Sequence, residues 1–195
     1  MIVKNVLEKL YNEEKFSMKE ISHKLNCSVN QVGYWMEKHN IERRSISESV
    51  YLKCNPNGDP FEVRKPQTLS DAMLYGIGLG LYWGEGNKAN QHSVRLGNTD
   101  PQLIKSFVYF LERIYGIKKT KLQFGLQIFS DMSAENALEF WCHELKAERK
   151  QFFKVTVTKS HRPGTYKKKI KHGVLTVYFN NKKLRDIICG EIEKL

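Results

Sequence analysis

One carboxylate closes a glycine-studded apolar stretch, GIGLGLYWGEG, at residues 76–86. Gly76, Gly80 and Gly84 recur every four residues, so on a helix they align along one side and leave a groove without side chains. Two such helices can pack with their backbones almost in contact. If the partner is the same helix of a second subunit, a two-fold axis brings two copies of Glu85 close together.

Paired carboxylates of this kind favour a divalent cation. Two nearby carboxylates repel each other unless a cation such as Mg²⁺ lies between or beside them. Glu85 also stands at the C-terminal end of its helix, where the dipole disfavours negative charge, and a residue placed against local preference suggests a use. The pattern predicts metal-activated water acting on a phosphodiester. The alternative is a structural helix pair in which Glu85 is a solvated terminal residue.

The positive charge of the chain is concentrated. The net charge is +11, and nearly all of the excess lies in residues 146–185, where Glu148 is the one acidic residue. Such a stripe attracts DNA or RNA, whereas the alternative is a solvated lysine-rich loop. Because the charges alternate with segments that resemble strands, we favour a nucleic-acid surface. The candidate DNA contacts of this half of the chain are Arg95, Lys159, Lys167, Lys168, Lys169 and Lys171.

Residues 1–45 predict a small all-α, helix-turn-helix domain. Ser17 with Glu20, and Ser28 with Gln31, have the spacing of capping boxes at the starts of the second and third of three short helices. A tight turn between these two helices is typical of a helix-turn-helix, and the alternative is a generic three-helix bundle. The candidate DNA contacts here are Asn30, Gln31, Tyr34 and Lys38 on the third helix, followed by Arg43 and Arg44.

The rest of the chain predicts a linker and an α+β domain. NPNGDP at residues 55–60 is a strong loop signal, so residues 46–69 are assigned to the linker and residues 70–195 to the second domain. Ser70 or Asp71 is expected to cap the glycine-rich helix, and Leu79 and Tyr82 to point into a core. An antiparallel sheet with helices on one face is expected. The expected strands are 93–98, 121–129, 152–159 and 173–179, and the further helices are 100–116, 133–146 and 181–195.

Composition argues against a membrane protein. The longest apolar run, residues 72–83, is shorter than the about 20 residues that a span needs. The N-terminus lacks the features of a signal peptide, and the four cysteines form no CxxC pattern. We therefore expect a cytoplasmic protein, nucleoid-associated if the source is bacterial, with no membrane partner.

The motif at residues 78–86 resembles that of the LAGLIDADG homing endonucleases, and the resemblance extends over residues 70–195. The close-packed small residues of that family fall on Gly80 and Gly84, and its metal-binding acid falls on Glu85. The resemblance implies a saddle-shaped antiparallel sheet on double-stranded DNA and a homodimer with its motif helices at the axis. The other catalytic residues that it implies are Asn98 and either Lys150 or Lys154.

Two functions of different class follow. The first is a site-specific DNA endonuclease of homing type, with Mg²⁺ or another divalent cation. The second is a transcription regulator that binds DNA on the same scaffold without hydrolysis, and an RNA-maturation factor is a third, less supported reading. Trp83 replaces the first acid of the motif, but Glu85 is retained and favours the endonuclease.

Overall fold

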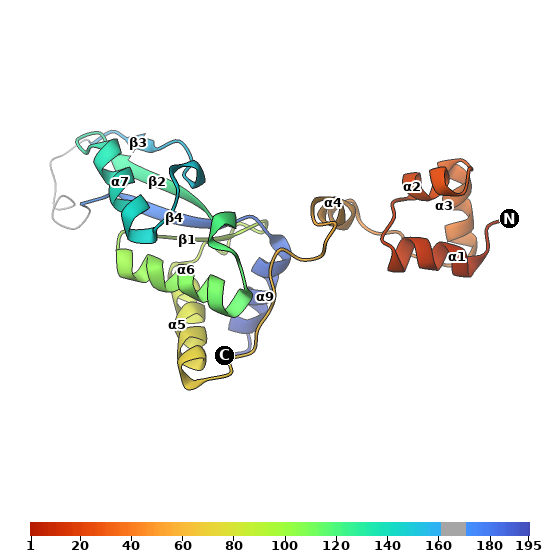
Figure 1. Cartoon of the computed structure of the whole chain (residues 1–195), viewed down its shortest axis with the longest axis horizontal. Coiled ribbons are helices and arrows are strands. Elements are labelled where there is room, and N and C mark those ends of the chain that lie inside the picture. Colours follow the sequence, from red (N-terminus) through yellow and green to blue (C-terminus); the bar gives the residue numbers. More distant parts are fainter. Residues whose placement is uncertain (161–170) are drawn as a thin grey trace. The chain divides into compact units, whose positions relative to one another are not determined.

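The computed structural model describes residues 1–160 and 171–195, in two compact units (Figure 1). The units are residues 1–60 and 61–195, so the division falls inside the predicted linker. That linker is partly helical, because Ile46–Cys54 forms α4, with Ser45 as its N-cap. No residue of α4 is buried. Residues 55–60 form neither helix nor strand, in agreement with the predicted loop. Residues 46–54, which were also assigned to the linker, instead form a capped helix.

The first unit contains the three helical segments expected. α1 (Lys4–Glu8) continues into a π-helical segment, η1 (Lys9–Glu13), and is followed by α2 (Met18–Lys24) and α3 (Val29–Lys38). The capping box of Ser17 and Glu20 is present in both halves, whereas at α3 the Ser28 side chain accepts from the backbone of Gln31. Their shared core consists of Leu7, Leu10, Tyr11, Ile21, Val32, Met36 and Ile41.

The second unit is built on a four-stranded mixed sheet, which confirms the α+β class. The strands are β1 (Val94–Asn98), β2 (Gln123–Phe129), β3 (Thr156–Thr158) and β4 (Val174–Phe179), in the order β1-β4-β2-β3. β4 pairs antiparallel with β1 and with β2.

The expectation of a fully antiparallel sheet is wrong at one edge, because β3 runs parallel to β2. The chain returns after the helix of residues 134–145 and comes alongside β2 in the same direction, and Phe152 already makes a parallel bridge to Phe124. β3 and β4 are therefore not a hairpin, since β2 lies between them. The physical reason is burial: β4 buries alternate residues and takes an inner position, whereas β3 exposes Val157 and stays at the edge.

In the described part of the second unit, the helices that complete the core are α5 (Leu69–Glu85), α6 (Pro101–Tyr115), α7 (Ala134–Leu145) and α9 (Lys182–Ile192). They share one hydrophobic cluster with alternate strand residues, such as Leu96, Leu126 and Val177. The intervening strand residues are exposed or half-buried, and we call their side of the sheet the open face. In the part of the chain that the structure describes, no helix combines the length and apolarity that crossing a bilayer requires.

α5 begins at Leu69, two residues earlier than a cap at Ser70 would allow. Its N-cap is Thr68, whose hydroxyl accepts from the backbone of Asp71, so the assignment of the cap to Ser70 or Asp71 is wrong. The carboxylate of Asp71 instead receives two hydrogen bonds from Arg113 of α6, at 2.8 and 3.2 Å. Leu79 and Tyr82 are fully buried, as predicted.

Candidate nucleic-acid interface

The outer side of α5 is apolar and exposed. Met73, Ile77 and Trp83 leave half or more of their surface open to solvent. A Cβ added at Gly76, Gly80 or Gly84 would meet nothing within 4 Å. We call these six residues the glycine stripe. The open space at the three glycines allows another helix backbone to approach closely, and contiguous exposed apolar surface commonly marks an interaction site.

Glu85 lies where α5 meets the edge of the sheet. Gly86 is extended, bridges to Leu96 of β1, and is followed by Asn87, whose N–H donates to the Arg95 carbonyl at 2.9 Å. The Glu85 side chain is exposed and makes no hydrogen bond or ion pair with any residue that the structure describes. The carboxylate is therefore available at the border between the glycine stripe and the sheet.

The donor chemistry at Glu85 fits one part of a magnesium site. Carboxylate oxygen is the ligand that Mg²⁺ prefers, and the ion is usually held by one or two carboxylates together with waters and substrate phosphates. Residues 1–160 and 171–195 contain no group of three or more His, Cys, Asp or Glu side chains that could hold a metal ion. Among the described residues, Glu85 is therefore one candidate ligand that does not belong to such a group.

Two cations lie at this end of α5 that sequence reasoning missed. The ammonium of Lys88 donates to the Trp83 carbonyl in the last turn of the helix. Arg185 of α9 donates to the Lys88 carbonyl at 2.7 Å and also pairs with Asp186. Lys88 follows Glu85 by only three residues, so its position near the carboxylate could have been predicted from the sequence. Arg185 comes from the far end of the chain, and only the fold places it beside Lys88.

The basic residues implied by the resemblance lie elsewhere. Lys150 belongs to the short 3-10 helix η3 (Arg149–Gln151) and pairs with Glu148 at 2.6 Å. Lys154 follows Phe153, whose N–H donates to the Phe124 carbonyl of β2. The segment of Lys150 and Lys154 lies beside β2, whereas Gly86 lies beside β1 at the opposite edge of the sheet. Four strand spacings of about 4.8 Å each separate the two segments. The structure therefore does not bring Lys150 or Lys154 to Glu85 within one chain.

Asn98 is used locally. It ends β1, and its side-chain oxygen accepts from the backbone N–H groups of Thr99 and Asp100, at 2.8 and 3.0 Å. These bonds hold the turn from β1 into α6. The side chain is half-buried, which leaves its amide nitrogen as the group that could contact a ligand.

Arg95 is held in a defined position on the open face. Its Nε donates to the buried Ser93 hydroxyl at 2.7 Å, and its guanidinium lies 5.1 Å from the ring centroid of Tyr178, its register partner on β4. Tyr178 in turn contacts the Phe153 ring edge-on and lies over Gly125, where a Cβ would be 2.9 Å away. Both terminal nitrogens of Arg95 lack hydrogen-bond partners among the described residues. A fixed guanidinium with free donors suits phosphate or base contact.

The open face also carries polar side chains, beside the half-buried Phe129 and Val174. Gln127 donates to the Thr158 hydroxyl at 3.0 Å, and Gln123 accepts from Asn180 at 3.0 Å. Amide and hydroxyl groups of this kind can hydrogen-bond base edges and phosphates. The alternation of QFGLQIF could have indicated these glutamines, but the sequence reasoning stopped at assigning a strand.

The predicted lysines of the C-terminal half are only partly placed. Lys159 directly follows β3 and Lys171 precedes β4, and both are exposed. Lys167, Lys168 and Lys169 lie outside the described residues. Of the predicted basic contacts in this segment, Lys159 and Lys171 are therefore the two that the structure shows as exposed.

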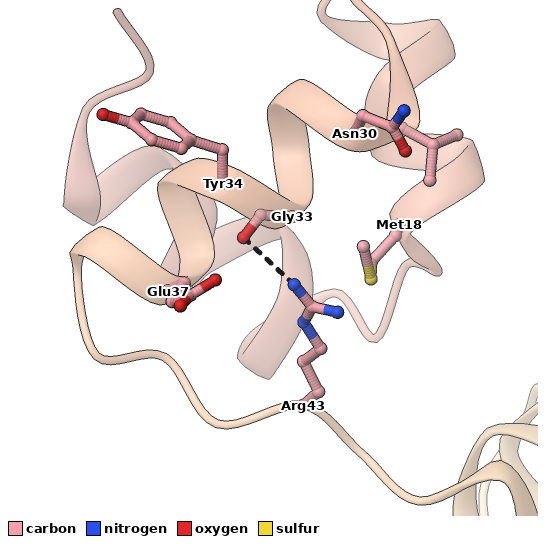
Figure 2. A pocket seen from close by; sticks show the side chains of 7 residues that line it. Met18, Asn30, Gly33, Tyr34, Glu37 and Arg43 are labelled. Atoms are coloured by element: carbon pink, nitrogen blue, oxygen red, sulfur yellow. Dashed lines mark hydrogen bonds between the residues drawn. The ribbon is translucent and has the colours of Figure 1, made fainter.

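The exposed side of α3 is a second candidate surface. Asn30, Gln31, Tyr34 and Lys38 are all exposed, as expected. Figure 2 shows a pocket on this side of the helix. Its lining residues are Met18, Val29, Asn30, Gly33, Tyr34, Glu37 and Arg43.

The two predicted arginines after α3 have different surroundings. Arg43 lines the pocket and donates to the Gly33 carbonyl at 3.3 Å (Figure 2). Arg44 turns inward, donates to the Lys15 and Phe16 carbonyls, and stacks its guanidinium 3.9 Å from the centroid of the Tyr11 ring. Arg44 thus holds the turn between η1 and α2, and Arg43 is the arginine that faces solvent with most of its donors free.

No family model, curated protein or solved structure matches the chain. The function must therefore be argued from the arrangement of the residues themselves. Two surfaces are candidates for binding nucleic acid: the open face with Glu85 at its border, and the exposed side of α3.

Proposed function

We propose that this protein is a site-specific DNA endonuclease that acts as a homodimer with Mg²⁺ or a similar divalent cation. The observation that carries the proposal is the position of Glu85. An exposed carboxylate without a partner among the described residues lies where the apolar glycine stripe meets the edge of a polar sheet face.

The homodimer accounts for the glycine stripe. Pairing α5 with its copy removes Met73, Ile77 and Trp83 from water, and removal of apolar surface from water drives association. The open space above Gly80 and Gly84 allows the two backbones to approach closely. The same pairing brings the two Glu85 carboxylates together and aligns the two sheet edges on either side of them.

The residues then have separate roles. In the dimer, the two Glu85 side chains hold the metal, which when bound would activate water and stabilise charge on the phosphodiester. Arg95 and the glutamines of the open face hold the duplex. Lys88 and Arg185 place positive charge near the carboxylates, which lowers their mutual repulsion and attracts the phosphate backbone. The net charge of +11 favours the same polyanionic ligand.

The test is cleavage of a randomised duplex library. Wild type with Mg²⁺ should produce enriched cut ends, and a chelator should abolish them. Glu85→Gln should bind the enriched site with equal or higher affinity but not cut it, because the amide keeps the size and removes the charge that the cation needs. Glu139→Gln, an exposed acid on α7, is the matched control and should cut normally. Metal-dependent cutting that survives in Glu85→Gln would refute the assignment.

A DNA-binding transcription regulator is the second candidate. It is favoured because Glu85 does not belong to any group of three or more His, Cys, Asp or Glu side chains among the described residues. Tight, sequence-selective binding by wild type with no cutting in Mg²⁺ or Mn²⁺ would support this function over the endonuclease.

A further inference from the structure

We infer that the pocket on α3 reads one G·C base pair in the major groove, with Arg43 donating to guanine and Glu37 accepting from cytosine. The inference rests on the proposed DNA binding and is independent of cleavage. It assigns to Arg43 a role in sequence selection, where the sequence alone indicated only a contact to DNA.

Gly33 creates the position that Arg43 occupies. A Cβ at Gly33 would lie 3.1 Å from Nη2 of Arg43 and 3.2 Å from the terminal methyl group of Met18, closer than ordinary contact. Without it, the guanidinium lies against the helix and donates to the Gly33 carbonyl (Figure 2). Glycine in a helix interior is disfavoured relative to alanine, so its presence at this point requires a reason. Close seating of Arg43 on the helix provides one.

The two charged side chains of the pocket remain available. Arg43 has five N–H donors, and its contact with Gly33 is made through one terminal nitrogen, Nη2. Glu37 is exposed and makes no side-chain hydrogen bond or ion pair with any described residue. Arg43 forms no ion pair within the same described part of the chain. Opposite charges that line one pocket without pairing can each engage a ligand.

The arrangement matches the edge of a G·C pair. In the major groove, guanine presents two acceptors, N7 and O6, and cytosine presents a donor, the N4 amino group. A guanidinium beside a carboxylate offers the complementary donors and acceptor. An A·T pair is a poorer fit because the adenine amino group would oppose the guanidinium.

The geometry of α3 also suits groove binding. Asn30, Gly33, Tyr34 and Glu37 have the i, i+3, i+4, i+7 spacing that places residues on one helix face, and the major groove admits a helix. Asn30 and Tyr34, which also line the pocket, are then in position to contact neighbouring bases or the backbone (Figure 2). The remaining exposed cation of α3, Lys38, is a phosphate contact in this arrangement.

The experiment is selection of bound sequences from a randomised duplex library, using the full chain in chelator so that no cutting occurs. Wild type should select G·C at one defined position. Arg43→Lys keeps the charge but loses the forked donors, so it should lose about 5- to 150-fold of discrimination at that position. Gly33→Ala keeps every polar group but shifts the guanidinium by a few tenths of an ångström, so it should reduce discrimination at the same position to a smaller extent. Glu37→Gln should relax the preference at the same base pair, because glutamine can also pair with adenine.

Lys38→Gln is the matched control. It should weaken binding to all sequences alike and reduce the slope of log affinity against log salt by about one. Arg43→Lys should leave that slope unchanged. Gly33→Ala should melt no lower than wild type, because alanine favours the helix, so a loss of selectivity cannot be attributed to unfolding.

Two results overturn the inference while DNA binding stands. One is a uniform loss of affinity in the Arg43 and Gly33 variants with the sequence preference intact, which would make Arg43 a phosphate contact. The other is a change at different positions in the Arg43 and Glu37 variants. If wild type binds single-stranded RNA in preference to every duplex, or binds no duplex at low salt, the proposed DNA-binding function fails and the inference fails with it.

Discussion

Two glycines on α5 should respond to the same substitution with opposite signs. Gly78 faces inward, and a Cβ added there would lie 2.1 Å from the ring of Phe110, which is itself fully buried. The ring cannot move aside into solvent, so Gly78→Ala forces α5 and α6 apart. Overpacking of this kind costs about 3 kcal/mol, against about 1 kcal/mol gained from the helix propensity of alanine. The net expectation is a loss of about 2 kcal/mol.

Gly80, two residues later, is the matched position. A Cβ there meets nothing within 4 Å, so Gly80→Ala should keep the propensity gain and stabilise the single chain by about 1 kcal/mol. The assay is urea unfolding at dilute protein. With a slope of about 2 kcal/mol per molar urea, Gly78→Ala should lower the midpoint by about 1 M and Gly80→Ala should raise it by about 0.5 M.

The larger substitution Gly80→Leu separates folding from association. In the single chain the added side chain points into open space, so the unfolding midpoint at dilute protein should not fall. In the dimer it stands between two backbones, and the dissociation constant measured by sedimentation should rise at least about tenfold, or about 1.4 kcal/mol. Equal loss of stability in Gly78→Ala and Gly80→Ala would refute the packing argument. A Gly80→Leu dimer as tight as wild type would refute the use of the glycine stripe.

Two further predictions concern an ion pair and the open face. The Arg113 guanidinium hydrogen-bonds Asp71 and lowers the pKa of that carboxyl from 3.8 to about 2, so the pair stabilises the fold above pH 4 and the contribution is lost as the pH falls from 4 towards 2. The urea midpoint of Asp71→Asn should therefore lie below that of wild type at pH 6 and approach it at pH 2, and a gap that persists at pH 2 would contradict this. Arg95→Ala should weaken binding to the selected duplex by about tenfold in fluorescence anisotropy, whereas Arg64→Ala, a control in the ion pair with Glu62, should not. Equal losses in the two variants would assign the effect to net charge.

Local signals in the sequence were sufficient for much of the secondary structure. Asp100 caps α6 with Pro101 in its first turn, and Gly116 ends the helix with φ of 58°, a left-handed conformation that suits glycine. Ser133 caps α7, at the first residue of the range predicted for that helix. These features depend on contacts within a few residues, so the residue types alone predict them. The α+β class followed from the same alternation of strand and helix patterns.

Strand order depended on the tertiary structure. The sheet was expected to be antiparallel throughout, but β3 joins the outer edge of β2 in parallel, and β4 packs between β1 and β2. Pairing partners are chosen by which strands bury a full face against the helices, and that competition involves residues far apart in the sequence. No local pattern encodes its outcome.

The candidate site residues were likewise only partly predictable from the sequence. The sequence singled out Glu85 and the spacing of Gly76, Gly80 and Gly84, because a carboxylate at the end of a glycine-lined helix is visible in one stretch. It could not show that Gly78 packs against Phe110 while Gly80 faces open space, since both are glycines of one helix.

Residue type alone could not distinguish the surroundings of two adjacent arginines, nor show which distant residues come together in the fold. Arg43 and Arg44 are adjacent and chemically identical, yet one faces the pocket on α3 and the other binds carbonyls of residues 15 and 16. Arg185 reaches the chain beside Glu85 across almost 100 positions. Residue type determines what each side chain can do, but its surroundings are set by packing between distant segments, and only the tertiary structure decides which capacity is used.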